Sequence, residues 1–237
     1  MIYSWGDVGR GKDMPAQGYA RTDDILYVDI SGDGQDEAVI SLHSSGTAGN
    51  QGVLVYTADN TGPRLVGVVS GYKLSPKAEG DHLVIWEPMY AGWGCNACFS
   101  GWRETRYRLQ ANQLVLIETT EGAYPEARAP TVEQFYELLN RRQYPRAYAF
   151  LSPAFQAAHP YDDWSAGYQN TLSIQVHATN HPDGSVAVQL TAVDKTDDFP
   201  ITQQYCGRWT LVWSAPDRQW LLDQAQIASV PEESPAC

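Results

Sequence analysis

Two different hydrophobic periods divide the chain. In residues 24–118, short runs rich in Val, Ile, Leu and Tyr are separated by Gly, Asn, Ser and Pro, and no helical period interrupts them. Apolar runs of this length between turn residues are typical of antiparallel strands. The pattern therefore predicts an all-β antiparallel domain with strands at 25–30, 37–42, 52–57, 64–69, 82–86, 103–109 and 113–117.

Beyond residue 130 the apolar positions take a helical spacing. Val132, Phe135, Tyr136, Leu138 and Leu139 form one stripe, and Thr131 with Gln134 has the spacing of a capping box. Prolines suit the first turn of a helix, so further short helices are predicted from residues 145 and 153, the latter capped by residue 152, and another near residues 162–163.

Period two returns at residue 171 and predicts strands that continue to residue 230. We therefore predict an all-β domain at 1–120, a linker at 121–130 that contains two prolines, an α+β domain at 131–230 and a tail at 231–237. A chain of 237 residues with 43% hydrophobic residues is long and apolar enough for two folded domains.

Charge and hydropathy exclude several functional classes. The formal net charge is −12, whereas nucleic-acid binding requires clustered Lys and Arg, so we expect no nucleic-acid partner. No apolar run is long enough to span a membrane, and no signal segment follows Met1, so any anchor would lie in a missing N-terminal segment. Gly-rich residues 44–49 lack the following Lys-Ser/Thr of a phosphate loop, and we predict no organic cofactor.

Three sequence segments of the second domain carry a family resemblance. Residues 135–139 (FYELL), 147–152 (AYAFLS) and 207–212 (GRWTLV), followed by 220–222 (WLL), resemble the NTF2-like superfamily, which includes SnoaL and ketosteroid-isomerase relatives. The resemblance implies a cone of three helices packed on a bent antiparallel sheet, with an internal pocket and a homodimer through the sheet. These segments concern packing, so they predict a fold more than an activity.

An acidic loop at residues 29–37 has the spacing of a calcium loop. It places oxygen-bearing side chains at alternate positions around a glycine, and it resembles the loops of FG-GAP and VCBS-type repeats in extracytoplasmic domains. The resemblance implies one structural Ca²⁺, with the ligands Asp29, Ser31, Asp33, Gln35 (through its carbonyl) and Glu37. The flanks are predicted strands and position 12 is Ile40, which exclude an EF-hand. A hairpin turn without metal explains the same residues equally well.

The four cysteines suggest structural bridges. Cys95 and Cys98 form a Cys-x-x-Cys without a βαβ unit or a second ligand pair, which favours a disulfide over a redox or zinc site. The domain boundary then favours Cys206 with Cys237; free thiols are the alternative. Disulfides and a calcium loop would both suit an extracytoplasmic location.

Aromatic side chains supply the candidate ligand-binding residues. A glycine-rich loop in the first domain contains Trp86, Tyr90, Trp93 and Trp102, and the second domain offers Tyr136 and Tyr148. Such rings can stack on a carbohydrate or peptide, or they can simply fill a core.

Two functional hypotheses follow. The first is a non-catalytic extracytoplasmic protein that binds a protein, peptide or carbohydrate ligand. The second is an isomerase, dehydratase or hydrolase that acts on a small apolar substrate in the pocket of the second domain, with His159, Asp163 or His177 as the base. Each of these three residues also suits a purely structural role, so the sequence favours the first hypothesis.

Overall fold

The computed structural model describes residues 19–44 and 46–230, and it divides into two compact units. The first unit comprises the described residues up to Met89 together with 95–122. The second comprises residues 90–94 and the described residues from Ala123 onward. The predicted linker at 121–130 holds the end of a strand, a 3₁₀ turn and the beginning of a helix.

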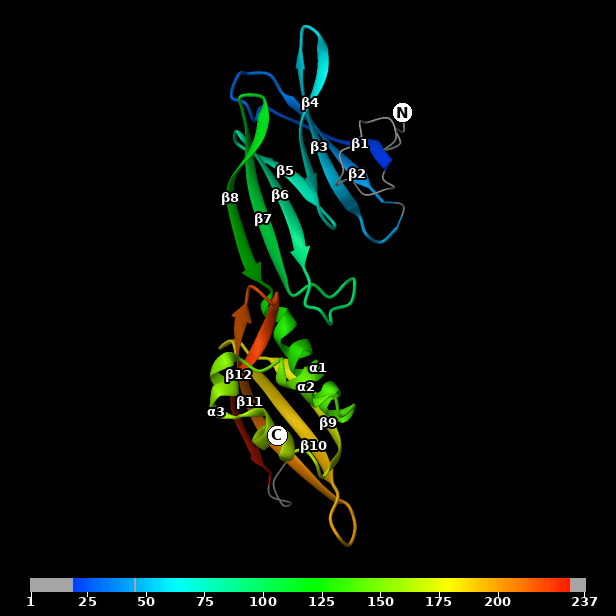
Figure 1. The fold of residues 1–237 in the computed structure, drawn as a ribbon, viewed down its shortest axis with the longest axis vertical. Coiled ribbons are helices and arrows are strands. Elements are labelled where there is room, and N and C mark those ends of the chain that lie inside the picture. Colours follow the sequence, from blue (N-terminus) through cyan, green and yellow to red (C-terminus); the bar gives the residue numbers. More distant parts are fainter. Residues whose placement is uncertain (1–18, 45, 231–237) are drawn as a thin grey trace. The chain divides into compact units, whose positions relative to one another are not determined.

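The first unit contains two four-stranded antiparallel sheets in which consecutive strands are neighbours (Figure 1). One sheet has the order β1-β2-β3-β4, with β1 at Tyr19–Val28, β2 at Glu37–His43, β3 at Asn50–Asp59 and β4 at Gly62–Ser70. The other has the order β5-β6-β7-β8, with β5 at Ser75–Glu79, β6 at His82–Met89, β7 at Gly101–Gln110 and β8 at Gln113–Ala123.

Alternate residues of both sheets form one apolar core. Val39, Val53 and Val55 come from one sheet and Leu83 and Ile85 from the other, and all five are at most 3% exposed. The sequence pattern missed β5, because Ser75-Pro76-Lys77 lacks apolar residues. This strand lies at the edge of its sheet. A proline is tolerated there, because an edge strand has a partner strand on one side only and needs no N–H on the other side.

Four short helices precede the sheet of the second unit. A 3₁₀ turn at Pro125–Ala127 leads into α1 at Arg128–Asn140, followed by α2 at Tyr144–Tyr148, α3 at Pro153–Ala158 and α4 at Tyr161–Ala166. Ser152 caps α3 as predicted, since its Oγ accepts from the Phe155 N–H at 3.0 Å. The predicted capping box is wrong: Thr131 lies inside α1 and its hydroxyl donates to the Ala127 carbonyl at 2.7 Å.

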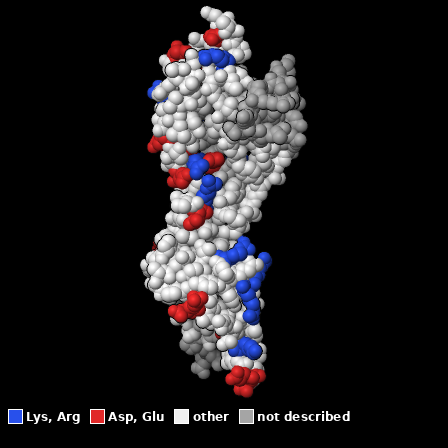
Figure 2. All heavy atoms as spheres, viewed as in Figure 1, with Lys and Arg blue, Asp and Glu red and all other residues white. Residues whose placement is uncertain are grey.

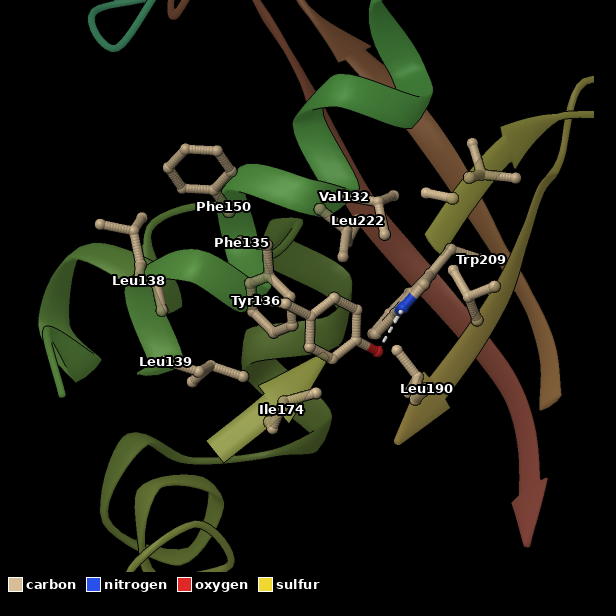
Figure 3. Close-up of a cluster of buried hydrophobic side chains, with 14 of the residues drawn as sticks. Val132, Phe135, Tyr136, Leu138, Leu139, Phe150, Ile174, Leu190, Trp209 and Leu222 are labelled. Atoms are coloured by element: carbon tan, nitrogen blue, oxygen red, sulfur yellow. Dashed lines mark hydrogen bonds between the residues drawn. The ribbon is translucent and has the colours of Figure 1, made fainter. Parts of the chain in front are cut away.

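The sheet of the second unit has the order β12-β11-β10-β9. Its strands are β9 at Thr171–Asn180, β10 at Val186–Asp194, β11 at Ile201–Ser214 and β12 at Gln219–Ser229. Side chains of the helices and of one sheet face interlock in the cluster of Figure 3, with Phe135 and Leu222 fully buried. Inside this cluster the Trp209 Nε1–H donates to the Tyr136 hydroxyl at 3.0 Å.

The predicted fold class is wrong. The described residues are mostly strand, at 53%, and form three separate four-stranded antiparallel sheets with four short helices, rather than an all-β domain followed by an NTF2-like cone of three helices. Prolines at positions 145, 153 and 160 divide the helical region, so that three of its helices have only five or six residues. Prolines and capping residues predicted these short helices, but the resemblance to the NTF2-like superfamily implied a cone of only three helices.

No helix within residues 19–44 and 46–230 has both the length and the apolar character that a membrane crossing requires.

Candidate functional site

A cavity with a mainly apolar lining lies between helices α3 and α4 and the sheet of the second unit, with a volume of about 600 Å³. Pockets for small molecules commonly have a few hundred Å³ and an aromatic lining with few polar groups. We call this cavity the aromatic cleft. Six aromatic residues line it: Tyr136, Phe155, Trp164, Tyr168, Tyr205 and Trp209.

Strand alternation explains why the sheet side of the cleft is mainly apolar. Leu190 and Ala192 lie on the same face of β10 as the buried Val186 and Val188, and both line the cleft. Asp194 follows at the next position of this face and is half-buried. The Thr171 hydroxyl donates to Asp194 Oδ1 at 2.7 Å, which fixes the carboxylate at the margin of the cleft.

Burial shifts the pKa of two tyrosines that line the cleft, Tyr136 and Tyr168. Burial raises the pKa of Tyr168 to about 12, and it raises the pKa of Tyr136 further, although the Trp209 hydrogen bond opposes that shift. Neither phenol can therefore act as a base near pH 7. Apart from tyrosines, the ionisable residues that line the cleft within the described chain are Asp194 and Lys195.

The three candidate catalytic residues lie outside the cleft. The His159 ring is exposed and stacks on Phe155 with a centroid distance of 4.2 Å. Asp163 is exposed in the first turn of α4, and His177 is exposed on β9. None of the three lines the cavity, so this geometry gives no support to an enzyme that uses them.

The predicted aromatic ligand-binding residues are divided between the two units. Trp86 packs edge-on against Phe99 in the first unit, and the Trp102 indole fills the space above Gly122. Tyr90 and Trp93 belong to the second unit, where the Trp93 ring packs on Phe150 and its N–H donates to Gln219 at 3.1 Å.

The two aromatic candidates of the second unit have different positions. Tyr136 lines the aromatic cleft, whereas Tyr148 does not. The Tyr148 hydroxyl donates to the His159 carbonyl at 2.8 Å and ties neighbouring helices together.

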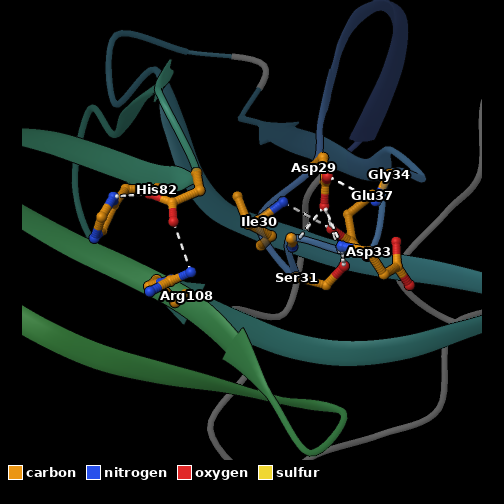
Figure 4. A network of polar contacts seen from close by, with 10 residues as sticks. Asp29, Ile30, Ser31, Asp33, Gly34, Glu37, His82 and Arg108 are labelled. Carbon is orange, nitrogen blue, oxygen red and sulfur yellow. Dashed lines mark hydrogen bonds and ion pairs between the residues drawn. The ribbon is translucent and has the colours of Figure 1, made fainter.

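The acidic loop is closed by its own hydrogen bonds (Figure 4). Asp29 Oδ1 accepts from the Gly32 N–H at 2.7 Å, and Oδ2 accepts from the Gly34 N–H at 2.9 Å. The bonds from Gly34 and the other loop donors lower the pKa of Asp29. Gly32 and Gly34 have φ of +77° and +85°, which explains why glycine is needed at both positions.

The remaining predicted calcium ligands point to separate partners. Glu37 is 1% exposed and its Oε2 accepts from the Ile30 N–H at 2.9 Å, while Asp33 Oδ1 accepts from the Gln35 N–H at 2.8 Å. No group of three or more His, Cys, Asp or Glu side chains suitable for a metal occurs among the described residues. These contacts neither support nor contradict the five predicted ligands, and calcium stays a prediction.

A smaller cavity of about 340 Å³ lies in the first unit. Its charged lining is already paired, because Arg103 bonds to Glu87 at 2.9 Å and to Glu121 at 2.7 Å. Figure 2 likewise shows acidic and basic side chains next to one another on this unit. A cavity whose charges neutralise each other has less capacity to attract a ligand than the aromatic cleft.

One predicted disulfide is present. Cys95 and Cys98 are bonded. Cys206 is not free, and Cys237 lies outside the described residues, so the second predicted bridge stays a prediction.

The sequence did not single out several residues of the cleft, notably Tyr168, Tyr205 and Asp194. The available signal was the alternation along β10. An acidic residue occupies the next position on the face that Leu190 and Ala192 form. The aromatic residues carried no such signal, since they come from separate helices and strands that only the folded chain brings together.

Comparison with known proteins assigns no family, because no family model matches the chain and no curated protein matches it significantly.

Proposed function

We propose that this protein is a non-catalytic binding protein whose aromatic cleft holds a small, largely apolar ligand. The observation that carries the proposal is the lining of the cleft, in which six aromatic side chains and the apolar residues of β10 surround about 600 Å³. Burial of apolar ligand surface against such side chains supplies the binding free energy. The absence of His159, Asp163 and His177 from the lining favours binding over acid–base catalysis.

We further propose that the protein works outside the cytoplasm. The Cys95–Cys98 bond supports this location, since structural disulfides persist mainly in oxidising compartments.

The test uses the neutral fluorescent probe N-phenyl-1-naphthylamine, which brightens in apolar sites. Ala225 lines the cleft from β12 but is solvent-exposed, so Ala225→Trp adds an indole to the cleft without removing a buried side chain. The variant should lose most of the probe binding. Gln226→Trp is the matched control, because Gln226 is exposed on the same strand and does not line the cleft.

Two results would contradict the proposal. One is absence of probe binding to the unmodified protein. The other is equal binding to both tryptophan variants and the unmodified protein, which would place the probe elsewhere on the surface. Circular dichroism spectra of the two variants should coincide with that of the unmodified protein, which shows that both are folded.

A further inference from the structure

The aromatic cleft is lined by a carboxylate, Asp194, that has no ion-pair partner among the described residues. Asp194 makes one hydrogen bond, from the Thr171 hydroxyl to Oδ1, and its other oxygen has no donor among the described residues. No ion pair joins Asp194 to Lys or Arg within the described chain, including the adjacent Lys195. A half-buried carboxylate next to apolar walls is stabilised by a nearby positive charge.

The neighbouring Lys195 offsets this charge only weakly. It also lines the cleft, but it is exposed to solvent and forms no ion pair with Asp194 within the described chain. An exposed ammonium keeps its hydration and is screened by salt. Of the two charges that line the cleft, the half-buried carboxylate is therefore the less screened by solvent.

The aromatic rings that line the cleft are inclined to one another. The Trp164 and Tyr168 rings have centroids 5.2 Å apart and planes at 61°, and the Phe155 and Trp209 rings are 5.7 Å apart at 48°. Because the rings are inclined, the faces of different rings can border the same part of the cleft from different sides. The faces of aromatic rings carry negative electrostatic potential and attract cations, above all alkylated ammonium groups.

We propose that the ligand of the aromatic cleft is an organic cation, with an alkylated ammonium group held among the rings beside Asp194. This inference rests on the proposed binding function and names its ligand class. Three features act together: a carboxylate without an ion-pair partner in the described chain, the inclined rings, and a chain charge of −12 that raises the local concentration of cations. An anionic ligand of the same shape would instead be repelled by Asp194.

Three phenols of similar shape and different charge test the inference by displacement of N-phenyl-1-naphthylamine. They are (4-hydroxyphenyl)trimethylammonium, its neutral isostere 4-tert-butylphenol, and 4-hydroxybenzenesulfonate. The cation should displace the probe at a concentration about tenfold lower than the neutral phenol, and the sulfonate should be the weakest. Asp194→Asn keeps an acceptor for Thr171, and it should remove most of the cation's advantage while leaving the neutral phenol unchanged.

Asp198→Asn is the matched control, because it removes the same charge at an exposed residue that does not line the cleft, and it should preserve the cation's advantage. Equal affinity for the cation and the neutral phenol, or strongest binding of the sulfonate, would overturn the inference while the proposed function stands. Persistence of the cation's advantage in Asp194→Asn would overturn the role of that carboxylate. Failure of the neutral probe itself to bind would refute the proposed function, so the two failures are distinguishable.

Discussion

The hydrogen bond between Trp209 and Tyr136 provides a quantitative test of the second unit. Both side chains are 4% exposed, and the bond joins β11 to α1 within the core. Tyr136→Phe keeps the ring and its packing but leaves the Trp209 N–H without an acceptor. An unpaired buried donor costs about 1–3 kcal/mol, and loss of the buried hydroxyl offsets part of that cost. We therefore expect a net destabilisation of about 1–2 kcal/mol.

For a unit of this size, a loss of about 1–2 kcal/mol lowers the midpoint of thermal unfolding by roughly 5–15 °C. Calorimetry and tryptophan fluorescence would follow the transition of the second unit. Tyr161→Phe is the matched control, since no hydrogen bond of the Tyr161 hydroxyl occurs among the described residues. If Tyr136→Phe shifts the midpoint no more than Tyr161→Phe does, the hydrogen bond does not stabilise this core.

Three further predictions concern other features. Burial raises the pKa of Tyr168 from its ordinary 10.0 to about 12, so its contribution to stability is complete below pH 10 and should fall as pH rises from 10 to 12. Spectrophotometric titration near 295 nm should show this phenol still protonated at pH 11 in folded protein. Tyr168→Phe should flatten the decline in stability over the same pH range. Millimolar Ca²⁺ should raise the unfolding midpoint of the unmodified protein and of Asp36→Ala, an equal charge change in the loop, but not of Asp33→Ala; identical responses of the two variants would argue against the predicted site. Mass spectrometry after alkylation without reductant should find no modified cysteine, whereas modified Cys206 would refute its predicted bridge to Cys237.

Much of the local structure could be predicted because local rules govern it. Alternation along β10 follows from burial of one sheet face, and the Ser152-Pro153 pair marks the first turn of α3. The predictions failed where local signals were weak or ambiguous. Strand β5 contains Pro76 and polar residues, and Thr131 has capping-box spacing although the helix already begins at Arg128.

The sequence by itself determined most strand positions, the acidic loop and the Cys95–Cys98 bridge, because each depends on residues close together along the chain. Only the tertiary structure decided the division into three separate sheets and the composition of the aromatic cleft. Tyr136, Trp164 and Asp194 are far apart in sequence and meet because helices and strands bury their apolar faces against each other. Single-sequence patterns record which face of an element is apolar, but they do not record which other element will cover it.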